Sequence, residues 1–188
     1  MNTSNNRFHT VRVVPTCHTS EVDDGEILFA PTEIPNACPK NGTAMLRQIA
    51  CHIQDDNNAD IELVFFSNSA TTEALGATAV NFLGGYNGGG NATDTEVENA
   101  CPLGNLTLDF ASGVAPTDVS STSSEYDESR NYTDNILLFK RNVNMPVFPG
   151  NLTSVGASES SSIYFYGIAT ATKTYTASGL VFYFTFEY

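Results

Sequence analysis

The sequence predicts an all-β protein: an antiparallel β-sandwich, jelly-roll-like, with about seven to nine strands and long loops. Three observations favour this fold class. Helical periodicity is nearly absent, short β-branched and aromatic runs recur along the chain, and Pro, Gly and Asx turn signals separate these runs. Charged residues make up only 15% of the chain, well below the usual quarter, so Ser, Thr, Asn and Gly replace them, as is typical of loop-rich β proteins.

The domain organisation that we expect is simple. The length of 188 residues suits one domain that buries a sizeable core without needing disulfides or a metal. We assign residues 10–188 to a single β-sandwich domain and residues 1–9 to a polar N-terminal arm, which reaches a neighbouring subunit or is disordered.

The first half of the chain contains four expected strands. The first stops at Pro15 and the second is closed by Pro31, because proline lacks the N–H that a ladder needs. An Asx-rich turn then joins the third to the fourth, which predicts a hairpin. The four expected strands are Thr10–Val14, Glu26–Ala30, Met45–Gln54 and Ile61–Phe66.

The third expected strand has a period of two with one exception. Met45, Ile49, Cys51 and Ile53 share one face, and Arg47 is the exception among them. Arg47 therefore interrupts an otherwise apolar face.

The second half of the chain is clear only toward its end. Residues 72–82 fit a short helix or a strand, the glycine run 84–90 is irregular, and residues 112–133 form a long polar loop. The expected strands here are Leu106–Phe110, Asn135–Lys140, Ser162–Ala169 and Leu180–Tyr188.

The last expected strand is unusually apolar. Leu180, Phe182, Phe184 and Phe186 fall on one face of it. Because an open edge of this kind would aggregate, we expect this strand to be central in its sheet or covered by a partner subunit.

Charge and hydropathy exclude two classes of partner. The formal net charge is −13, from 8 basic and 21 acidic residues, and the only adjacent basic pair is Lys140–Arg141, so we expect no nucleic-acid binding. No apolar run approaches the ~20 residues that span a membrane. The first residues also lack an apolar signal region, so we expect synthesis in the cytoplasm.

No motif in the sequence predicts catalysis, so we expect no enzyme, no catalytic residues and no cofactor. The nearest approach to a Gly-x-Ser-x-Gly elbow, at residues 156–160, lacks its second glycine. The pairs Cys17–His18 and Cys51–His52 would each aim only one ligand inward from a strand, so we expect no metal there. The turn Asp55–Asp60 begins like a calcium loop but lacks its glycine and glutamate, and the hairpin accounts for it better.

Four cysteines are present, at positions 17, 38, 51 and 101. We expect free buried thiols in a protein made in the cytoplasm. Asn-Ala-Cys-Pro occurs at 36–39 and again at 99–102, so a Cys38–Cys101 bridge is an alternative that the sequence does not fix, although chance repetition explains the pattern better.

Exposed aromatic side chains are the remaining candidates for a binding site. Tyr86 and Tyr126 lie in polar loops, and Phe8 lies in the expected arm. Aromatic rings in such places stack on sugars or anchor subunit contacts, although single exposed rings are also common on ordinary proteins.

Two stretches of the chain resemble a known class of protein. One is Glu26–Ala37 with the strand, Asp-rich turn and Leu63–Phe66 that follow it. The other is Ser160–Tyr164 with Thr174–Leu180 and the final apolar strand. Together they resemble small β-rich virion structural proteins of tailed bacteriophages, including marine and cyanobacterial phages. The resemblance covers about half of the chain, and the middle, residues 69–133, departs from it.

The resemblance implies a non-enzymatic structural protein and brings no catalytic residues. We expect a capsid decoration (cement) protein on the outer surface of the phage head, with the major capsid protein as its partner and a homotrimer as its assembly. The alternative is a fibre or knob module that binds a host receptor or glycan.

Overall fold

The computed structural model describes residues 7–40, 42–54, 59–67, 102–108, 136–149 and 161–188, with the backbone alone at 136–139. These residues form strands and connections, and contain no helix that is long and apolar enough to cross a membrane. The strands are β1 (Phe8–Val13), β2 (Ile27–Ile34), β3 (Ala44–Ile53), β4 (Ile61–Phe66), β5 (Pro102–Leu108), β6 (Ile136–Val147), β7 (Ile163–Ala169) and β8 (Leu180–Glu187).

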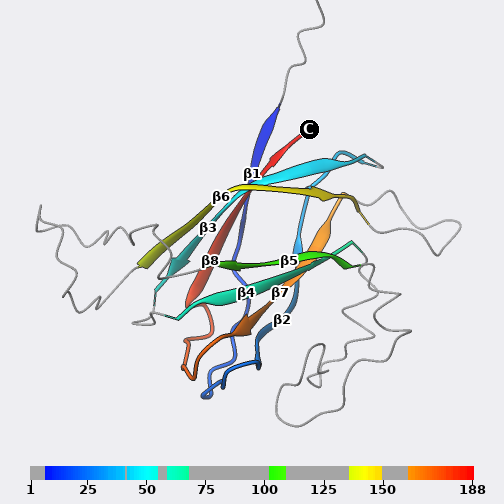
Figure 1. Cartoon of the computed structure of the whole chain (residues 1–188). Helices are drawn as coiled ribbons and strands as arrows, with labels where there is room; N and C mark the ends of the chain where they lie inside the picture. Colours follow the sequence, from blue (N-terminus) through cyan, green and yellow to red (C-terminus); the bar gives the residue numbers. More distant parts are fainter. Residues whose placement is uncertain (1–6, 41, 55–58, 68–101, 109–135, 150–160) are drawn as a thin grey trace, which may run out of the picture.

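The eight strands form two antiparallel sheets that pack face to face (Figure 1). Sheet A has the order β1-β8-β3-β6, and sheet B has the order β2-β7-β4-β5. Strands therefore pair first with last: β1 with β8, β2 with β7, β3 with β6 and β4 with β5. The chain runs in one direction through β1 to β4 and returns through β5 to β8, as in one long hairpin. Rolling this hairpin into a two-layer sandwich gives the jelly-roll arrangement. The predicted fold class is confirmed.

An aromatic cluster joins the two sheets. Phe165 of β7 lies at its centre, with ring centroids 4.8 Å from Phe184, 5.2 Å from Phe182 and 5.2 Å from Phe29. Tilted and edge-to-face pairs at these distances add to the stabilisation that comes from burial. Gly167 sits directly opposite Phe29, and a Cβ at Gly167 would lie 2.4 Å from the Phe29 ring. The glycine is therefore what lets the Phe29 ring approach the backbone of β7 so closely.

The last strand takes the central position that its composition predicts. Strand β8 lies between β1 and β3, and Leu180, Phe182, Phe184 and Phe186 are all fully buried. Sheet B covers its apolar face, through ring contacts such as that between Phe184 and Phe165, and both of its edges are hydrogen bonded within sheet A.

Several predicted strand boundaries are wrong for reasons that involve proline and bulges. Strand β2 runs through Pro31 to Ile34, because a register shift between Phe29 and Thr32 places the proline in an irregular part of an edge strand. Strand β6 continues to Val147 with Pro146 inside it, and β6 is again an edge. Strand β5 starts earlier than predicted, at Pro102.

The predicted face of the third strand is also wrong at one residue. The register of β3 shifts between Leu46 and Gln48 against both neighbouring strands. Against β8, Arg47 is an extra, bulged residue, whereas against β6 the extra residues lie on β6, between Arg141 and Met145. A one-residue shift inverts the alternation. Leu46 is consequently buried and Met45 only half-buried, while Ile49, Cys51 and Ile53 face the core as predicted.

The expected boundary between arm and domain stays a prediction. Residues 1–6 lie outside the described part of the chain. Phe8 and His9, which the prediction assigned to the arm, belong to β1 and lie opposite Glu187 and Phe186.

Candidate interaction surface

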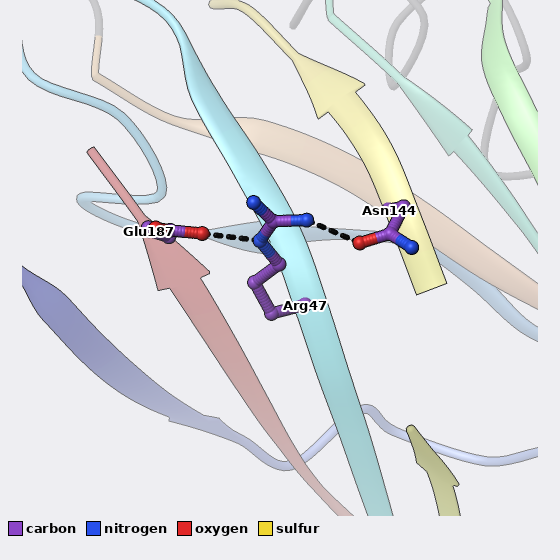
Figure 2. Close-up of polar contacts among 3 residues, drawn as sticks. All are labelled: Arg47, Asn144 and Glu187. Carbon is purple, nitrogen blue, oxygen red and sulfur yellow. Dashed lines mark hydrogen bonds and ion pairs between the residues drawn. The ribbon is translucent and has the colours of Figure 1, made fainter. Parts of the chain in front are cut away.

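The bulge in β3 organises polar side chains on the outer face of sheet A. The Arg47 Nε donates to Glu187 Oε2 on β8, and Nη1 donates to Asn144 Oδ1 on β6 (Figure 2). Asn142 and Asn144 adopt positive φ angles of 58° and 51°, which asparagine tolerates better than most residues. The contact connects three strands at one end of the sheet. A charge-assisted cluster of this kind holds the three strands in place.

The outer face of sheet B has a different chemical character. Val64, Phe66, Tyr166 and Ile168 point away from sheet A, yet each is at most 5% exposed. Phe66 and Tyr166 stack with their ring centroids 5.4 Å apart. Burial, followed by the nearby Glu62 carboxylate, raises the pKa of the Tyr166 phenol far above its ordinary value, so the phenol stays protonated. Sheet B is thus apolar on both faces.

The three predicted contact residues are not brought together by the described part of the structure. Phe8 lies on the edge strand β1 and is 64% exposed, which fits a contact residue. Tyr86 and Tyr126 lie outside the described residues. Their role stays a prediction.

The two Cys–His pairs lie as the alternation predicts. Cys17 and Cys51 are buried, and His18 and His52 are half-buried. In the part of the chain that the structure describes, no group of three His, Cys, Asp or Glu residues is placed to hold a metal ion. Of the expected hairpin turn Asp55–Asp60, residues 55–58 lie outside the described part of the chain, and at its end Thr170 Oγ1 donates to the Asp60 carbonyl at 2.7 Å.

The thiols of Cys38 and Cys51 are held in their protonated form. Burial raises the pKa of Cys38 to about 11, against a smaller opposing effect of a backbone hydrogen bond, and its Sγ donates to the Val147 carbonyl at 3.6 Å. Burial, and next the nearby Cys17, raises the pKa of Cys51 well above its ordinary value. Because the thiolate is the reactive form, Cys38 and Cys51 are poor nucleophiles at neutral pH. Cys101 lies outside the described residues, so the alternative of a bridge to Cys38 is untested.

Sequence reasoning missed the partners of Arg47. The only signal was the arginine at an apolar position of β3. Nothing in the sequence indicated that Asn144 and Glu187, respectively 97 and 140 residues away, would meet it. Those contacts depend on the strand order, which a single sequence does not contain.

The strand order and pairing define this chain as a jelly-roll β-sandwich. No family model and no curated protein matches the chain. Among solved structures, a chain in the structure of black queen cell virus is 10% identical with a TM-score of 0.33, covering 97% of this chain and 66% of that one. A chain of Desmodium yellow mottle tymovirus is 12% identical with a TM-score of 0.25, covering 98% of this chain and 81% of that one. This chain therefore spans just under two thirds of the black queen cell virus chain. Because both TM-scores are low, the fold is defined here by the strand order and not by these two similarities.

Proposed function

We propose that this chain is a non-enzymatic virion structural protein that decorates the outer surface of a tailed-phage head. The observation that carries the proposal is the wrapped strand order, β1-β8-β3-β6 against β2-β7-β4-β5. Eight-stranded jelly rolls of this kind serve as viral capsid domains, as lectins and as cupins. Because a fold alone does not fix a function, the choice among these depends on the surface and on the sequence.

The sequence favours the virion among these alternatives. Two stretches resemble structural proteins of tailed phages, and they correspond to β2 to β4 and to β7 with β8. A net charge of −13 suits a protein that faces water outside the shell and not the packaged genome. Its partners are then the major capsid protein and further copies of itself, with a trimer as the expected assembly.

A fibre or knob module is the second candidate. The exposure of Phe8, at 64%, is compatible with stacking on a sugar or anchoring a receptor. A knob of this kind is present in few copies at the tail, whereas a decoration protein follows the symmetry of the head.

Copy number in purified virions separates the two candidates. Quantitative mass spectrometry against the major capsid protein is expected to give hundreds of copies per particle for a decoration protein. A dozen or so copies would transfer the proposal to the fibre or knob. Absence from the particles would overturn the virion proposal altogether.

A second experiment tests the partner directly. Purified protein is mixed with capsids that lack it and then sedimented. We expect saturable binding to capsids and none to an equal mass of a glycan-coated resin. Binding to the resin alone, weakened by Phe8→Ala, would favour the knob.

A further inference from the structure

Three of the four edge strands in the described residues carry features that prevent pairing with another strand. Strand β2 has Pro31 and a shifted register, and strand β5 begins at Pro102 with a register shift close to it. Strand β6 contains Pro146 and a wide irregularity opposite Arg47. Prolines and bulges of this kind are what natural sheets use to block edge-to-edge association.

Strand β1 has none of these features. It pairs with β8 through six consecutive residues, Phe8 to Val13, without a shift, and it contains no proline. In the described part of the chain no strand pairs with its other side. Strand β1 is therefore a regular, open edge.

The backbone groups on this open edge are identified by the pairing with β8. Arg7 and Tyr188 exchange two backbone hydrogen bonds, of 3.0 and 3.1 Å. Hydrogen-bonded pairs alternate along an antiparallel ladder, so His9, Val11 and Val13 also bond to β8. The N–H and C=O groups of Phe8, Thr10 and Arg12 consequently point outward, away from the sheet.

The side chains of these three residues share the outer face of sheet A. Phe8, Thr10 and Arg12 are all exposed, whereas Val11 and Val13 are buried against the core. The ionisable residues next to or within β1, namely Arg7, His9 and Arg12, are all basic types, although the chain as a whole carries −13. Two copies that approach through this strand therefore meet no acidic side chain of β1 itself.

We propose that β1 pairs antiparallel with β1 of a second copy of this chain, on a two-fold axis at Thr10. In this register Thr10 faces Thr10 of the second copy, and Phe8 faces its Arg12. Each exposed ring then lies beside a guanidinium, which is a favourable cation–π arrangement, and it occurs twice by symmetry. The two arginines are roughly 14 Å apart along the strands, so like charges do not meet.

The pairing would join two sheets A into one continuous eight-stranded sheet. Its self-complementarity about Thr10 is the reason to choose a second copy over an unrelated peptide, which would have to supply its own partners for Phe8 and Arg12. Such a two-fold contact joins two free copies or two copies in neighbouring trimers. It does not depend on the proposed function, because it concerns the isolated protein as well.

Cysteine cross-linking tests the register. In a hydrogen-bonded antiparallel pair opposite Cα atoms are about 5.5 Å apart, which a disulfide spans, whereas roughly 14 Å is far too long. Under mild oxidation we expect Thr10→Cys to give mainly a disulfide-linked dimer, and Arg12→Cys and the wild type to stay monomeric on a non-reducing gel. The double variant Phe8→Cys/Arg12→Cys is expected to link again. Equal linking of Thr10→Cys and Arg12→Cys, or none in either, would overturn the proposal.

A backbone variant tests the hydrogen bonds without relying on cysteine. Thr10→Pro removes an N–H that faces the open edge and leaves the ladder to β8 intact. Thr10→Val is the matched control, because it keeps the N–H and removes the hydroxyl bond to Thr185. We expect Thr10→Pro to weaken the dimer at least about tenfold by sedimentation and Thr10→Val to leave it unchanged. Equal effects of the two variants would contradict pairing through the backbone.

Hydrogen exchange gives a third readout on the unmodified protein. At high concentration the amides of Phe8, Thr10 and Arg12 are expected to become protected, while those of His9 and Val11 are protected at every concentration. Fast exchange at Thr10 in a sample shown to be dimeric would place the dimer contact elsewhere and refute the proposal.

Discussion

The outer faces of the two sheets differ in what they leave open to solvent. On sheet A, the pair Thr10 and Thr185 and the Arg47–Glu187 contact give a polar, partly exposed surface, and the buried Ala50 and Val181 there are small. On sheet B, large side chains such as Phe66 and Tyr166 are buried although sheet A packs on the opposite side. Sheet B therefore has an apolar layer on each face, whereas sheet A has only one.

The difference teaches how to interpret the strand sequences. A strand that is covered on one face alternates, as β1 does, with exposed Phe8, Thr10 and Arg12 between more buried residues. A strand that is covered on both faces is apolar almost throughout, as in Ile61–Phe66 and Ile163–Ala169. Sheet B follows this second pattern, because side chains on both of its faces are buried.

Substituting Phe66 gives the largest expected effect on this comparison. Phe66→Ala removes a fully buried ring and its stack on Tyr166, and we expect a loss of about 3 to 5 kcal/mol in the free energy of unfolding. Urea denaturation measures it. The matched variant is Tyr183→Ala, at a half-buried position on the outer face of sheet A, and its loss should be less than half as large. Equal losses would mean that the two outer faces are covered alike.

The inner face of sheet B is tested by a substitution that adds one carbon. Gly167→Ala places a methyl group against the Phe29 ring, which must move, and we expect a loss of about 1 to 3 kcal/mol. Thermal unfolding measures it. Combining it with Phe29→Leu makes room for the methyl group, so the double variant should be more stable than the sum of the two single losses implies. Strict additivity would contradict the contact.

Alkaline pH sharpens the comparison through Tyr166. The pKa of the Tyr166 phenol is raised in the folded protein above its ordinary value of 10.0. The stabilisation that comes from burying the neutral phenol is therefore fully present below pH 10 and is lost as the pH rises above it. We expect the wild type to lose stability above pH 10 and Tyr166→Phe to lose less, as measured by urea denaturation at several pH values. Tyr183→Phe, on the outer face of sheet A, is the comparison variant. An identical decline in the wild type and Tyr166→Phe would exclude Tyr166 as a source of the alkaline loss.

The smallest expected effect is at Arg47. Its side chain is 37% exposed, so solvent screens the ion pair with Glu187, and Arg47→Met should cost about 0 to 1 kcal/mol. The loss should shrink further as salt is added, which a denaturation series in sodium chloride measures. A loss comparable with that of Phe66→Ala would show that the bulge and not the packing of sheet B governs stability.

The sequence predicted the positions of the strands far better than their arrangement. Each expected strand overlaps an observed one, because β-branched and aromatic runs bounded by turn residues are local signals. Pro31 misled the prediction, since a proline closes a central strand but is tolerated in an irregular edge. Strand β6 continues through Asn142 and Asn144 at positive φ, and this is a tertiary choice that no local pattern indicates.

The candidate surface was predictable only in part. Phe8 was identified from its aromatic character and is exposed, and Arg47, noted only as an exception on an apolar face, is the extra residue of the bulge against β8. That Thr10 and Arg12 present an open backbone edge could not be predicted, because it requires knowing that β1 lies at the end of its sheet. The buried outer layer of sheet B left a signal in the unbroken apolar run of β7, but its meaning depends on which strands are its neighbours.

The pairing of first strand with last has a consequence for how the protein acquires its fold. Strand β8 lies between β1 and β3, so sheet A has no continuous ladder until the final strand is present. On the ribosome β8 is synthesised last of the eight, and until then β1 has no partner in sheet A and β3 can pair only with β6. Contacts between residues so distant in sequence form slowly. Sheet A is therefore completed only once β8 has been made, and we expect the folding yield to depend on temperature and chaperones before that point.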